Sequence, residues 1–330
     1  MTALRRILGA LCLVACARAG AAELVIVDND WTASASSSLL PLLAAPGIEV
    51  LGLTTVTGDA WRDQGRRELG AFLAAVGKPA IPVVSGALMP LHNTRARMLA
   101  WETVHGTIPW KGAWNDATPP AVAAPAGEDA ADFMVRQVRA HPQQVTIYAA
   151  GPLTNVALAL QREPRFATLA RQLVFTGANL TQIKANGRVK SDFNFLFDPE
   201  AADIVLRAGW ARITSLGDAA DDAVLTPQLR RRLLAQSTAG ARHLAANNPD
   251  GSTQWDLLGA VIVADPSVVT GTLDVKMAVD LDGGLFHGRA RAWLNENAPA
   301  SAGAPVTVVR SVDLARFADD VVASAHAPLP

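Results

Sequence analysis

Short runs of apolar residues recur along the chain and predict the strands of a sheet. Six runs of aliphatic and β-branched residues occur, at residues 24–27, 48–56, 81–84, 145–149, 173–176 and 213–216. Most are separated by segments with apolar residues at helical spacing, and the clearest of these are residues 62–76, 130–140 and 201–208. Strands that alternate with helices indicate an α/β fold with a mostly parallel central sheet flanked by helices, a Rossmann-like open sheet.

The third of these helices has a well-marked beginning. It follows Asp198, Pro199 and Glu200, which suit a cap, the first helical position and the positive end of the helix dipole. Two stretches break the alternation, residues 89–126 and 178–192, and we expect long functional loops there. Neither a repeat nor a linker divides the chain, so we expect one domain over residues 23–330.

The first residues have a different pattern, which is typical of export. Two arginines precede an apolar run over residues 7–17, and small residues follow it. This predicts a signal peptide over residues 1–22 and a periplasmic or secreted protein. An alternative stays open, because Leu-Val-Ala-Cys at residues 13–16 resembles a lipobox that would make Cys16 a lipidated N-terminus. The apolar run is shorter than the about 20 residues that span a bilayer, so we expect no transmembrane segment.

Charge and cysteine content narrow the chemistry. The 330 residues are 50% hydrophobic and 18% charged, which describes a chain able to bury a sizeable core. A formal net charge of -1 gives no electrostatic reason to expect nucleic acid as a partner and favours a small neutral ligand. Both cysteines, Cys12 and Cys16, lie in the leader, so we expect no disulfide, zinc thiolate or Cys nucleophile in the mature chain.

Acidic residues follow several of the expected strands. Asp28 and Asp30 end the first strand, Asp59 follows the second, Ala150 lies in the turn after the fourth, and Asp256 opens a later apolar segment. The carboxyl ends of parallel strands form the edge at which open α/β sheets bind ligands. Carboxylates and backbone carbonyls gathered there would suit Ca²⁺. For any single Asp, a turn former or helix cap is the common alternative.

Six blocks of sequence follow one another in a specific order: VIVDND, EVLGLTTVTGD, IPVVSGALMPL, AGPLTNVALAL, DFNFLFDPEAADIVL and WDLLGAVIVADPSVV. Together, and over nearly the whole mature chain, they resemble the inosine-uridine preferring nucleoside hydrolase family. The resemblance implies a nucleoside-hydrolase-like fold and hydrolysis of the N-glycosidic bond of a purine or pyrimidine ribonucleoside to ribose and free base. It also implies a Ca²⁺ ion at the base of the pocket, bound to ribose hydroxyls and to the attacking water.

The resemblance gives roles to residues at matching positions. Asp30 would be the general base and a metal ligand, Asp256 a second metal ligand, and Ala150 a ligand through its backbone carbonyl. Substrate-binding candidates carried over in the same way are Asp28, Asp192 and Asn194 on the ribose side, with Asp192 in place of the usual Glu, and Asn179 or Asn186 at the 5′ end.

The first motif departs from the family. The usual Asp-x-Asp-Pro-Gly-x-Asp-Asp reads Asp-Asn-Asp-Trp-Thr-Ala-Ser-Ala at residues 28–35, so both acids of the final pair are missing. Ser34 could still bind a ribose hydroxyl, whereas Ala35 has no group that binds metal. Asp59 stands where the family commonly has Asn, and we hypothesise that its carboxylate restores the lost charge as a metal ligand.

The side of the pocket that faces the leaving base departs as well. Trp255 occupies the position of the His that protonates the base in some members, and Trp has no proton to give at neutral pH. It would either stack on the base or fill the pocket wall. His105, in a Trp-rich loop at residues 101–110, falls near the family's pocket histidine and is a substrate-binding candidate, with an incidental position as the alternative.

Three functions are consistent with these patterns. The first is a metal-dependent ribonucleoside hydrolase that acts outside the cytoplasm. The second is a nucleoside- or sugar-binding protein that kept the pocket and lost turnover with the acid pair. The third is a hydrolase of another N- or O-ribosyl compound, for which the Trp-rich loop would provide an enlarged aromatic wall. Family members resemble dimers or tetramers, so a homo-oligomer is an open expectation.

Overall fold

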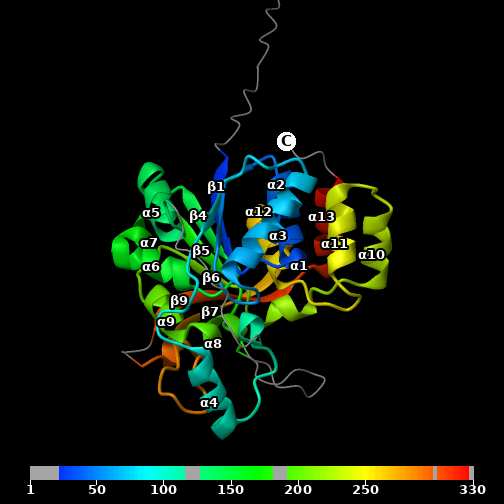
Figure 1. The fold of residues 1–330 in the computed structure, drawn as a ribbon. Coiled ribbons are helices and arrows are strands. Elements are labelled where there is room, and N and C mark those ends of the chain that lie inside the picture. The colour runs from blue at the N-terminus through cyan, green and yellow to red at the C-terminus, as the bar shows by residue number, and fades with distance from the viewer. Residues whose placement is uncertain (1–21, 116–126, 181–191, 300–302, 327–330) are drawn as a thin grey trace, which may run out of the picture.

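The computed structural model describes residues 22–115, 127–180, 192–299 and 303–326. Within these ranges nine strands form one sheet in the order β3-β2-β1-β4-β5-β6-β9-β7-β8 (Figure 1). Their bounds are β1 (Glu23–Asn29), β2 (Ile48–Thr55), β3 (Val83–Ser85), β4 (Val145–Ala149), β5 (Gln172–Phe175), β6 (Ile213–Ser215), β7 (Val269–Val279), β8 (Ala290–Leu294) and β9 (Ala304–Val312). Neighbouring strands from β3 to β9 pair in parallel, and β7 pairs antiparallel with β9 and β8. The expected mostly parallel α/β sheet and its six apolar strands are confirmed.

Helices connect the strands and cover the sheet. They are α1 (Ala33–Ser36), α2 (Leu40–Ala44), α3 (Arg62–Ala75), α4 (Arg95–His105), α5 (Ala130–Ala140), α6 (Thr154–Arg162), α7 (Phe166–Leu169), α8 (Phe193–Phe197), α9 (Pro199–Leu206), α10 (Pro227–Leu234), α11 (Ala239–Asn247), α12 (Trp255–Ala264) and α13 (Leu314–His326). Short 3-10 turns are η1 (Ser37–Leu39), η2 (Gly112–Asn115), η3 (Gly217–Asp222), η4 (Pro266–Val268) and η5 (Asn295–Asn297). The three helices expected from apolar spacing are α3, α5 and α9, and Asp198 caps α9 by accepting a hydrogen bond from the Ala201 backbone N at 3.1 Å. None of the helices in the described ranges is long and apolar enough to cross a membrane.

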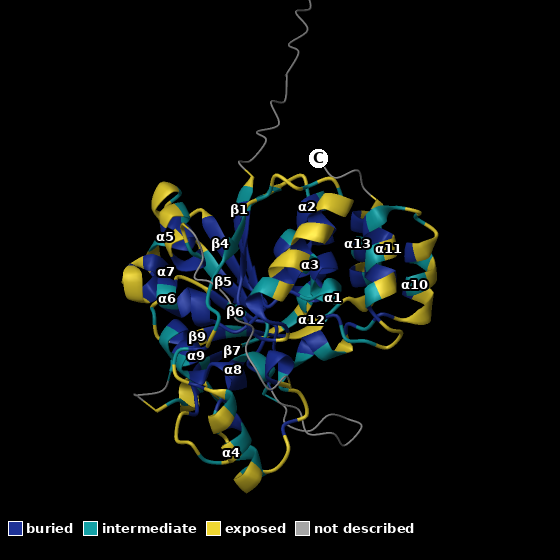
Figure 2. Cartoon of the chain, viewed as in Figure 1, coloured by how far each residue is buried: buried dark blue, intermediate teal, exposed yellow. Residues whose placement is uncertain are grey.

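The first strand shows how the sequence places a core on both faces of the sheet. Leu24 and Ile26 pack with α5, α6, α7 and α9, whereas Val25 and Val27 pack with α2, α3 and α10 to α13. Successive residues of a strand point to opposite faces, so a continuous apolar run needs cover on both sides. In Figure 2 the strands are buried between two helical layers whose outer surfaces are exposed. The carboxyl ends of the parallel strands therefore lie at one edge between the layers.

The stretch at residues 89–126 differs from the expected long loop, because it contains the helix α4. Thr94 caps this helix by accepting a hydrogen bond from the Arg97 backbone N at 3.2 Å. Met98 is the buried residue of α4, so the helix lacks the repeated apolar spacing that identifies α3 and α5. It projects beside α8 at the bottom of Figure 1. His105, expected in a loop, is the last residue of this helix.

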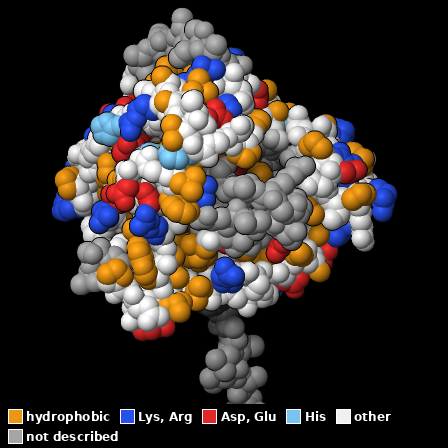
Figure 3. All heavy atoms as spheres, turned by 90° about the horizontal axis from the view of Figure 1, so that it is seen from below, with side chains coloured by type: hydrophobic (Ala, Val, Ile, Leu, Met, Phe, Trp, Pro, Cys, Tyr) orange, Lys and Arg blue, Asp and Glu red, His pale blue; other side chains and the backbone are white. Residues whose placement is uncertain are grey.

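The strands β7, β8 and β9 were not expected from the sequence. Most positions of β7 alternate between half-buried and exposed, so this strand has no continuous apolar run. β8 is the last strand of the sheet, and among the described strands only β7 pairs with it. On the face seen in Figure 3, acidic, basic and apolar side chains are interspersed, in keeping with the net charge near zero.

Candidate functional site

A cavity of about 490 Å³ lies at the carboxyl edge of the sheet. Its walls come from the segments that directly follow β1, β2, β4, β5 and β6, from the loop after α4, and from the beginnings of α8 and α12. The lining residues are Asp30, Asp59, Pro109, Trp110, Ala150, Thr176, Gly177, Asn179, Asp192, Phe193, Asn194, Gly217, Asp221, Trp255 and Asp256. The volume is in the range of small-molecule sites.

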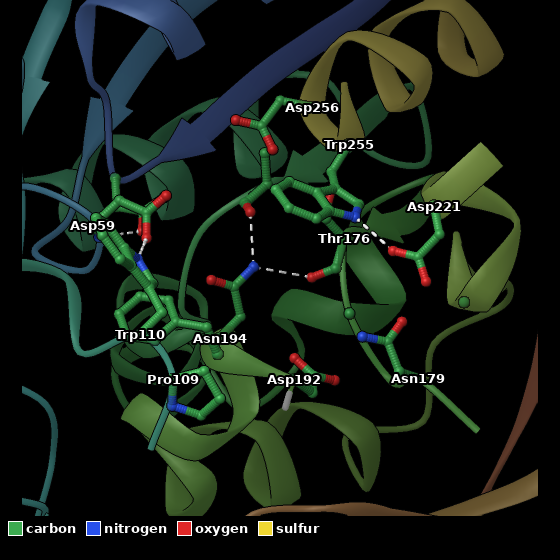
Figure 4. A pocket seen from close by; sticks show the side chains of 15 residues that line it. Asp59, Pro109, Trp110, Thr176, Asn179, Asp192, Asn194, Asp221, Trp255 and Asp256 are labelled. Atoms are coloured by element: carbon green, nitrogen blue, oxygen red, sulfur yellow. Dashed lines mark hydrogen bonds between the residues drawn. The ribbon is translucent and has the colours of Figure 1, made fainter. Parts of the chain in front are cut away.

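The cavity is strongly acidic. Five of its lining residues are Asp, and none of the lining residues that the structure describes is Lys, Arg or His. In Figure 4, Asp59 and Asp256 stand on one side of Asn194, and Asp192 and Asn179 stand on the other. Such a surface suits a cation, or a ligand rich in hydroxyl donors.

Asp30 is held in place on one side of the cavity, together with Asp59 and Asp256; we call this the acidic side. It is 5% exposed, and its carboxylate Oδ2 accepts a hydrogen bond from the Asp59 backbone N at 2.5 Å. Gly58 and Gly151 pack against it so closely that an added Cβ would lie 2.1 Å from Asp30 Oδ2 and 2.7 Å from the Asp30 backbone N, respectively. Asp30 can therefore occupy this position only because Gly58 and Gly151, which follow β2 and β4, have no side chain.

Burial and mutual repulsion disturb the ionisation of the three neighbouring acids. Burial, followed by the charges of Asp59 and Asp256, holds the pKa of Asp30 well above its usual range. Burial also raises the pKa of Asp256 to about 7, against the lowering effect of a hydrogen bond from Asn29. Partial desolvation in the cleft raises the pKa of Asp59, and a hydrogen bond from Trp110 lowers it. A bound cation would stabilise the ionised forms of all three.

Two residues that the sequence did not point to hold Asp256 in place. Asn29 donates from Nδ2 to Asp256 Oδ2 at 3.0 Å and accepts from the Asp30 backbone N at 2.9 Å, so it links the two acids. The Tyr148 hydroxyl donates to the backbone carbonyl of Asp256 at 2.7 Å. Asp256 also lies in the first turn of α12, where the helix dipole favours a negative charge. The sequence feature that could have identified Asn29 is its position between Asp28 and Asp30 at the end of a strand.

The opposite wall brings together the residues expected to hold the ribose. Asn194 donates from Nδ2 to the carbonyl oxygens of Ala150 and Thr176, at 2.7 and 3.0 Å (Figure 4). Asp192 caps α8 and accepts a hydrogen bond from the backbone N of Ala178. Ala178 has a φ of 59°, a left-handed conformation that costs energy for a residue with a Cβ and that Asp192 stabilises. Asn179 follows it in the same wall.

Two tryptophans form an aromatic wall. Trp255 is 43% exposed and lines the cavity, so its ring face is available to a ligand. Its Nε1 donates to Asp221 Oδ1 at 3.0 Å. Trp110 is 49% exposed and donates from Nε1 to Asp59 Oδ1 at 2.5 Å. Asp221 was missed from the sequence, although it belongs to η3, which follows β6 and could have been found by the same rule of acids after strands.

Three of the sequence candidates lie outside the cavity lining. Asp28 is fully buried inside β1 and accepts hydrogen bonds on Oδ1 from Thr54 Oγ1 and Asn155 Nδ2, at 2.6 and 2.7 Å, so it ties β1 to β2 and α6 and is neither a turn former nor a helix cap. Ser34 lies in α1 and shares a hydrogen bond of 2.8 Å with the hydroxyl of Thr32, which caps that helix.

His105 lines a separate cavity of about 280 Å³, in which its ring lies 5.0 Å from that of Trp101. The structure does not bring this histidine together with the acidic residues. Asn186, the second candidate for the 5′ end, lies outside the described residues.

The residues of the acidic side fit a hard divalent cation in charge and donor type. In the described parts of the chain, no group of three or more His, Cys, Asp or Glu side chains is arranged as a ready set of metal ligands. The charges of Asp59 and Asp256 nevertheless raise the pKa of Asp30, and the charge of Asp59 raises the pKa of Asp256, which marks excess negative charge in one place. The Ala150 carbonyl has a second lone pair besides the one used by Asn194. Oxygen donors of this kind suit Ca²⁺ or Mg²⁺.

Comparison with known proteins gives consistent results. The family model described as inosine-uridine preferring nucleoside hydrolase matches residues 25–319. A probable uridine nucleosidase 1 of Oryza sativa subsp. japonica is 35% identical over 56% of the chain and 55% of its own length. Uridine nucleosidase 1 of Arabidopsis thaliana is 34% identical over 60% of the chain and 57% of its own length. The matches thus span little more than half of the length of these relatives.

A solved structure of a plant nucleoside hydrolase, the PpNRh1 enzyme, has the same fold. It superimposes with a TM-score of 0.74 at 23% identity and covers 92% of this chain and 99% of its own.

Proposed function

The chain belongs to the inosine-uridine preferring nucleoside hydrolase family, and from this membership we propose that it hydrolyses the N-glycosidic bond of ribonucleosides to ribose and free base. The observation that carries the proposal is the cavity itself. Five Asp side chains and two Asn side chains line it, beside two tryptophans. This combination would place a polyhydroxylated sugar against acceptors and a flat base against aromatic rings.

Asp30 is the proposed general base. Its carboxylate lies beside Asp59 and Asp256 in the cavity and is held by the Asp59 backbone N, so it is placed to accept a proton from a water in the cavity. A water molecule beside it would lose a proton to Asp30 while its oxygen attacks the anomeric carbon of the ribose. The C–N bond breaks as the C–O bond forms, with its electron pair leaving on the base, and the negative charge of the surrounding carboxylates would stabilise the positive charge that develops on the sugar.

Asp30, Asp256, the Ala150 carbonyl and Asp59 would hold the cation, which we propose to be Ca²⁺. When bound, the cation would supply positive charge that lowers the pKa of the attacking water and would orient ribose hydroxyls. Asn194, through Oδ1, and the Asp192 carboxylate would accept hydrogen bonds from the sugar hydroxyls, and Asn179 would face its 5′ end. Asp59 supplies the carboxylate that residues 34 and 35 lack.

The leaving base has no imidazole or amine beside it among the described lining residues. Trp255 offers a ring face and an N–H that is already bonded to Asp221, rather than a transferable proton. We propose that the base leaves as an anion or takes its proton from solvent. We expect ribosides with good leaving groups, such as p-nitrophenyl riboside, to react faster than those whose base needs protonation.

The test is an assay of the purified protein with a panel of ribonucleosides and p-nitrophenyl riboside, with added Ca²⁺ or with chelator. Free base and reducing sugar are measured, and Asp30→Asn is the control. Release that requires both metal and Asp30 supports the proposal. Saturable binding without release would instead favour a nucleoside- or sugar-binding protein. Release from non-nucleoside ribosides alone would favour a hydrolase of another ribosyl compound.

Export is a separate proposal, since residues 1–21 with Cys16 lie outside the described residues. Mass spectrometry of the N-terminus in the native host distinguishes cleavage near residue 22 from lipidation at Cys16, and an intact Met1 would contradict both. Light scattering of the purified protein tests the expected homo-oligomer.

A further inference from the structure

Trp110 connects the loop after α4 to the acidic side of the cavity. Its ring lines the cavity and its indole N–H donates to Asp59 Oδ1 at 2.5 Å (Figure 4). We propose that Trp110 is a positioning residue of the cation site, which holds one oxygen of Asp59 and thereby directs the carboxylate toward Asp30 and Asp256. This inference rests on the cation site of the proposed function.

The loop is fixed on the side of α4. Glu102, in the last turns of that helix, accepts a hydrogen bond on Oε1 from the Ile108 backbone N at 2.7 Å. The same oxygen forms an ion pair with Lys111 Nζ at 2.9 Å. Glu102 thus holds the chain on both sides of Trp110, and the buried side chain of Ile108 anchors it further.

The loop is also fixed on the side of β2. The Ala113 backbone N donates to the Gly58 carbonyl oxygen at 2.8 Å, directly before Asp59 in the chain. Gly112 approaches so closely that an added Cβ would lie 2.2 Å from that same oxygen. Trp114 is buried and packs on Phe197, with ring centroids 4.2 Å apart. The indole of Trp110 therefore reaches Asp59 from a backbone that is already in place.

Asp59 needs such a partner because the bond that fixes its backbone leaves its carboxylate free to rotate. Its backbone N is fixed by Asp30 Oδ2, but the residue is exposed to the cavity, and among the described residues Trp110 supplies the hydrogen bond to the carboxylate. A carboxylate that can rotate is a poorer ligand than one held in a single orientation. Hydrogen-bond partners that orient metal ligands commonly contribute about 10- to 100-fold to metal affinity.

The experiment measures Ca²⁺ affinity of the whole protein by isothermal titration calorimetry. Trp110→Phe keeps an apolar ring and removes the N–H, and we expect Ca²⁺ to bind about 10- to 100-fold more weakly. Trp101→Phe is the matched control, because the Trp101 N–H donates to the Gly284 carbonyl at 2.9 Å, outside the acidic cavity. This control should leave the affinity unchanged. In an Asp59→Ala background, Trp110→Phe should have no further effect, because its action passes through Asp59.

The possible results separate this inference from the proposed function. Equal Ca²⁺ affinity of wild type and Trp110→Phe would overturn the inference and leave the proposed function intact. The same would follow if Trp110→Phe weakened binding equally in the Asp59→Ala background. If wild type bound no Ca²⁺ but still released base, the cation site and this inference would both fall while hydrolysis stood. Absence of both binding and release would overturn the proposed function as well.

Discussion

Replacement of Asp256 by Asn should stabilise the cation-free protein at neutral pH. The pKa of Asp256 is raised from 3.8 to about 7. Each tenfold difference in proton affinity corresponds to about 1.4 kcal/mol, so ionisation of Asp256 opposes folding by about 4 kcal/mol. Asp256 is partly exposed to the cavity, and solvent screening reduces this cost to about 2 kcal/mol. Asn removes the charge and keeps an oxygen that can accept the hydrogen bond from Asn29.

The pH dependence of this gain follows from the direction of the shift. The folded protein binds the Asp256 proton more tightly than the unfolded chain does, so wild type loses stability as the pH rises from about 4 to about 7. The Asn variant has no such group. The difference in free energy of unfolding should therefore be near zero at pH 4, grow up to about pH 7 and stay constant above it.

Thermal unfolding in chelator between pH 4 and pH 8.5 measures this difference. At pH 8 the Asp256→Asn variant should melt about 4 °C above wild type. Glu49→Gln, at an exposed position of β2, is the matched control and should show no such rise. With saturating Ca²⁺ the order should reverse, because the cation stabilises only the protein that binds it. A variant that melts at or below wild type in chelator at pH 8 would show that the acidic side carries no excess negative charge.

Three further changes test the geometry of the site. Gly58→Ala should abolish hydrolysis, because the new Cβ would lie 2.1 Å from Asp30 Oδ2. The control is Gly70→Ala in helix α3, where an added Cβ meets nothing within 4 Å. This control should keep activity and raise the free energy of urea unfolding by about 0.5–1 kcal/mol. Asn29→Ala removes the hydrogen bond from Asn29 Nδ2 to Asp256 Oδ2, and kcat/KM should fall about 10- to 100-fold, the value of a hydrogen bond to a charged group. Trp31→Phe leaves a buried carbonyl of β2 without its indole donor and should cost about 1–3 kcal/mol of unfolding free energy, and no measurable loss would contradict its place in the core.

The parallel half of the sheet was predictable because burial leaves a local signal. Strands such as β1 and β4 are covered on both faces and appear as continuous apolar runs. β7 mixes exposed, half-buried and buried positions without a continuous apolar run, and α4 buries little beyond Met98, so neither has a pattern that distinguishes it from a loop. Their positions depend on contacts between distant parts of the chain, which periodicity does not contain.

The site was predictable to the extent that strand ends meet at one edge. That rule placed Asp30 and Asp59 at one edge, the family resemblance added Asp256, which lies at the start of α12, and the structure brings all three to one cavity. It could not tell that the side chain of Asp28 turns into the sheet, or that His105 belongs to a helix facing another cavity. Such outcomes depend on the direction of a side chain rather than on its place in the sequence.

The altered first motif and Asp59 have one physical explanation. Trp31 is buried and donates to the Thr54 carbonyl at 2.8 Å, and Thr32 caps α1 with a hydroxyl, so this segment forms a neutral helix start instead of presenting an acid pair. Asp59, at the next strand end, is the residue proposed above to replace part of the missing charge, and its backbone N donates to Asp30 Oδ2. That carboxylate is exposed to the cavity, unlike Asp30, and so it needs a partner to orient it. The indole N–H of Trp110 is that partner, so changes in the loop after α4 should alter cation binding at the acidic side of the cavity.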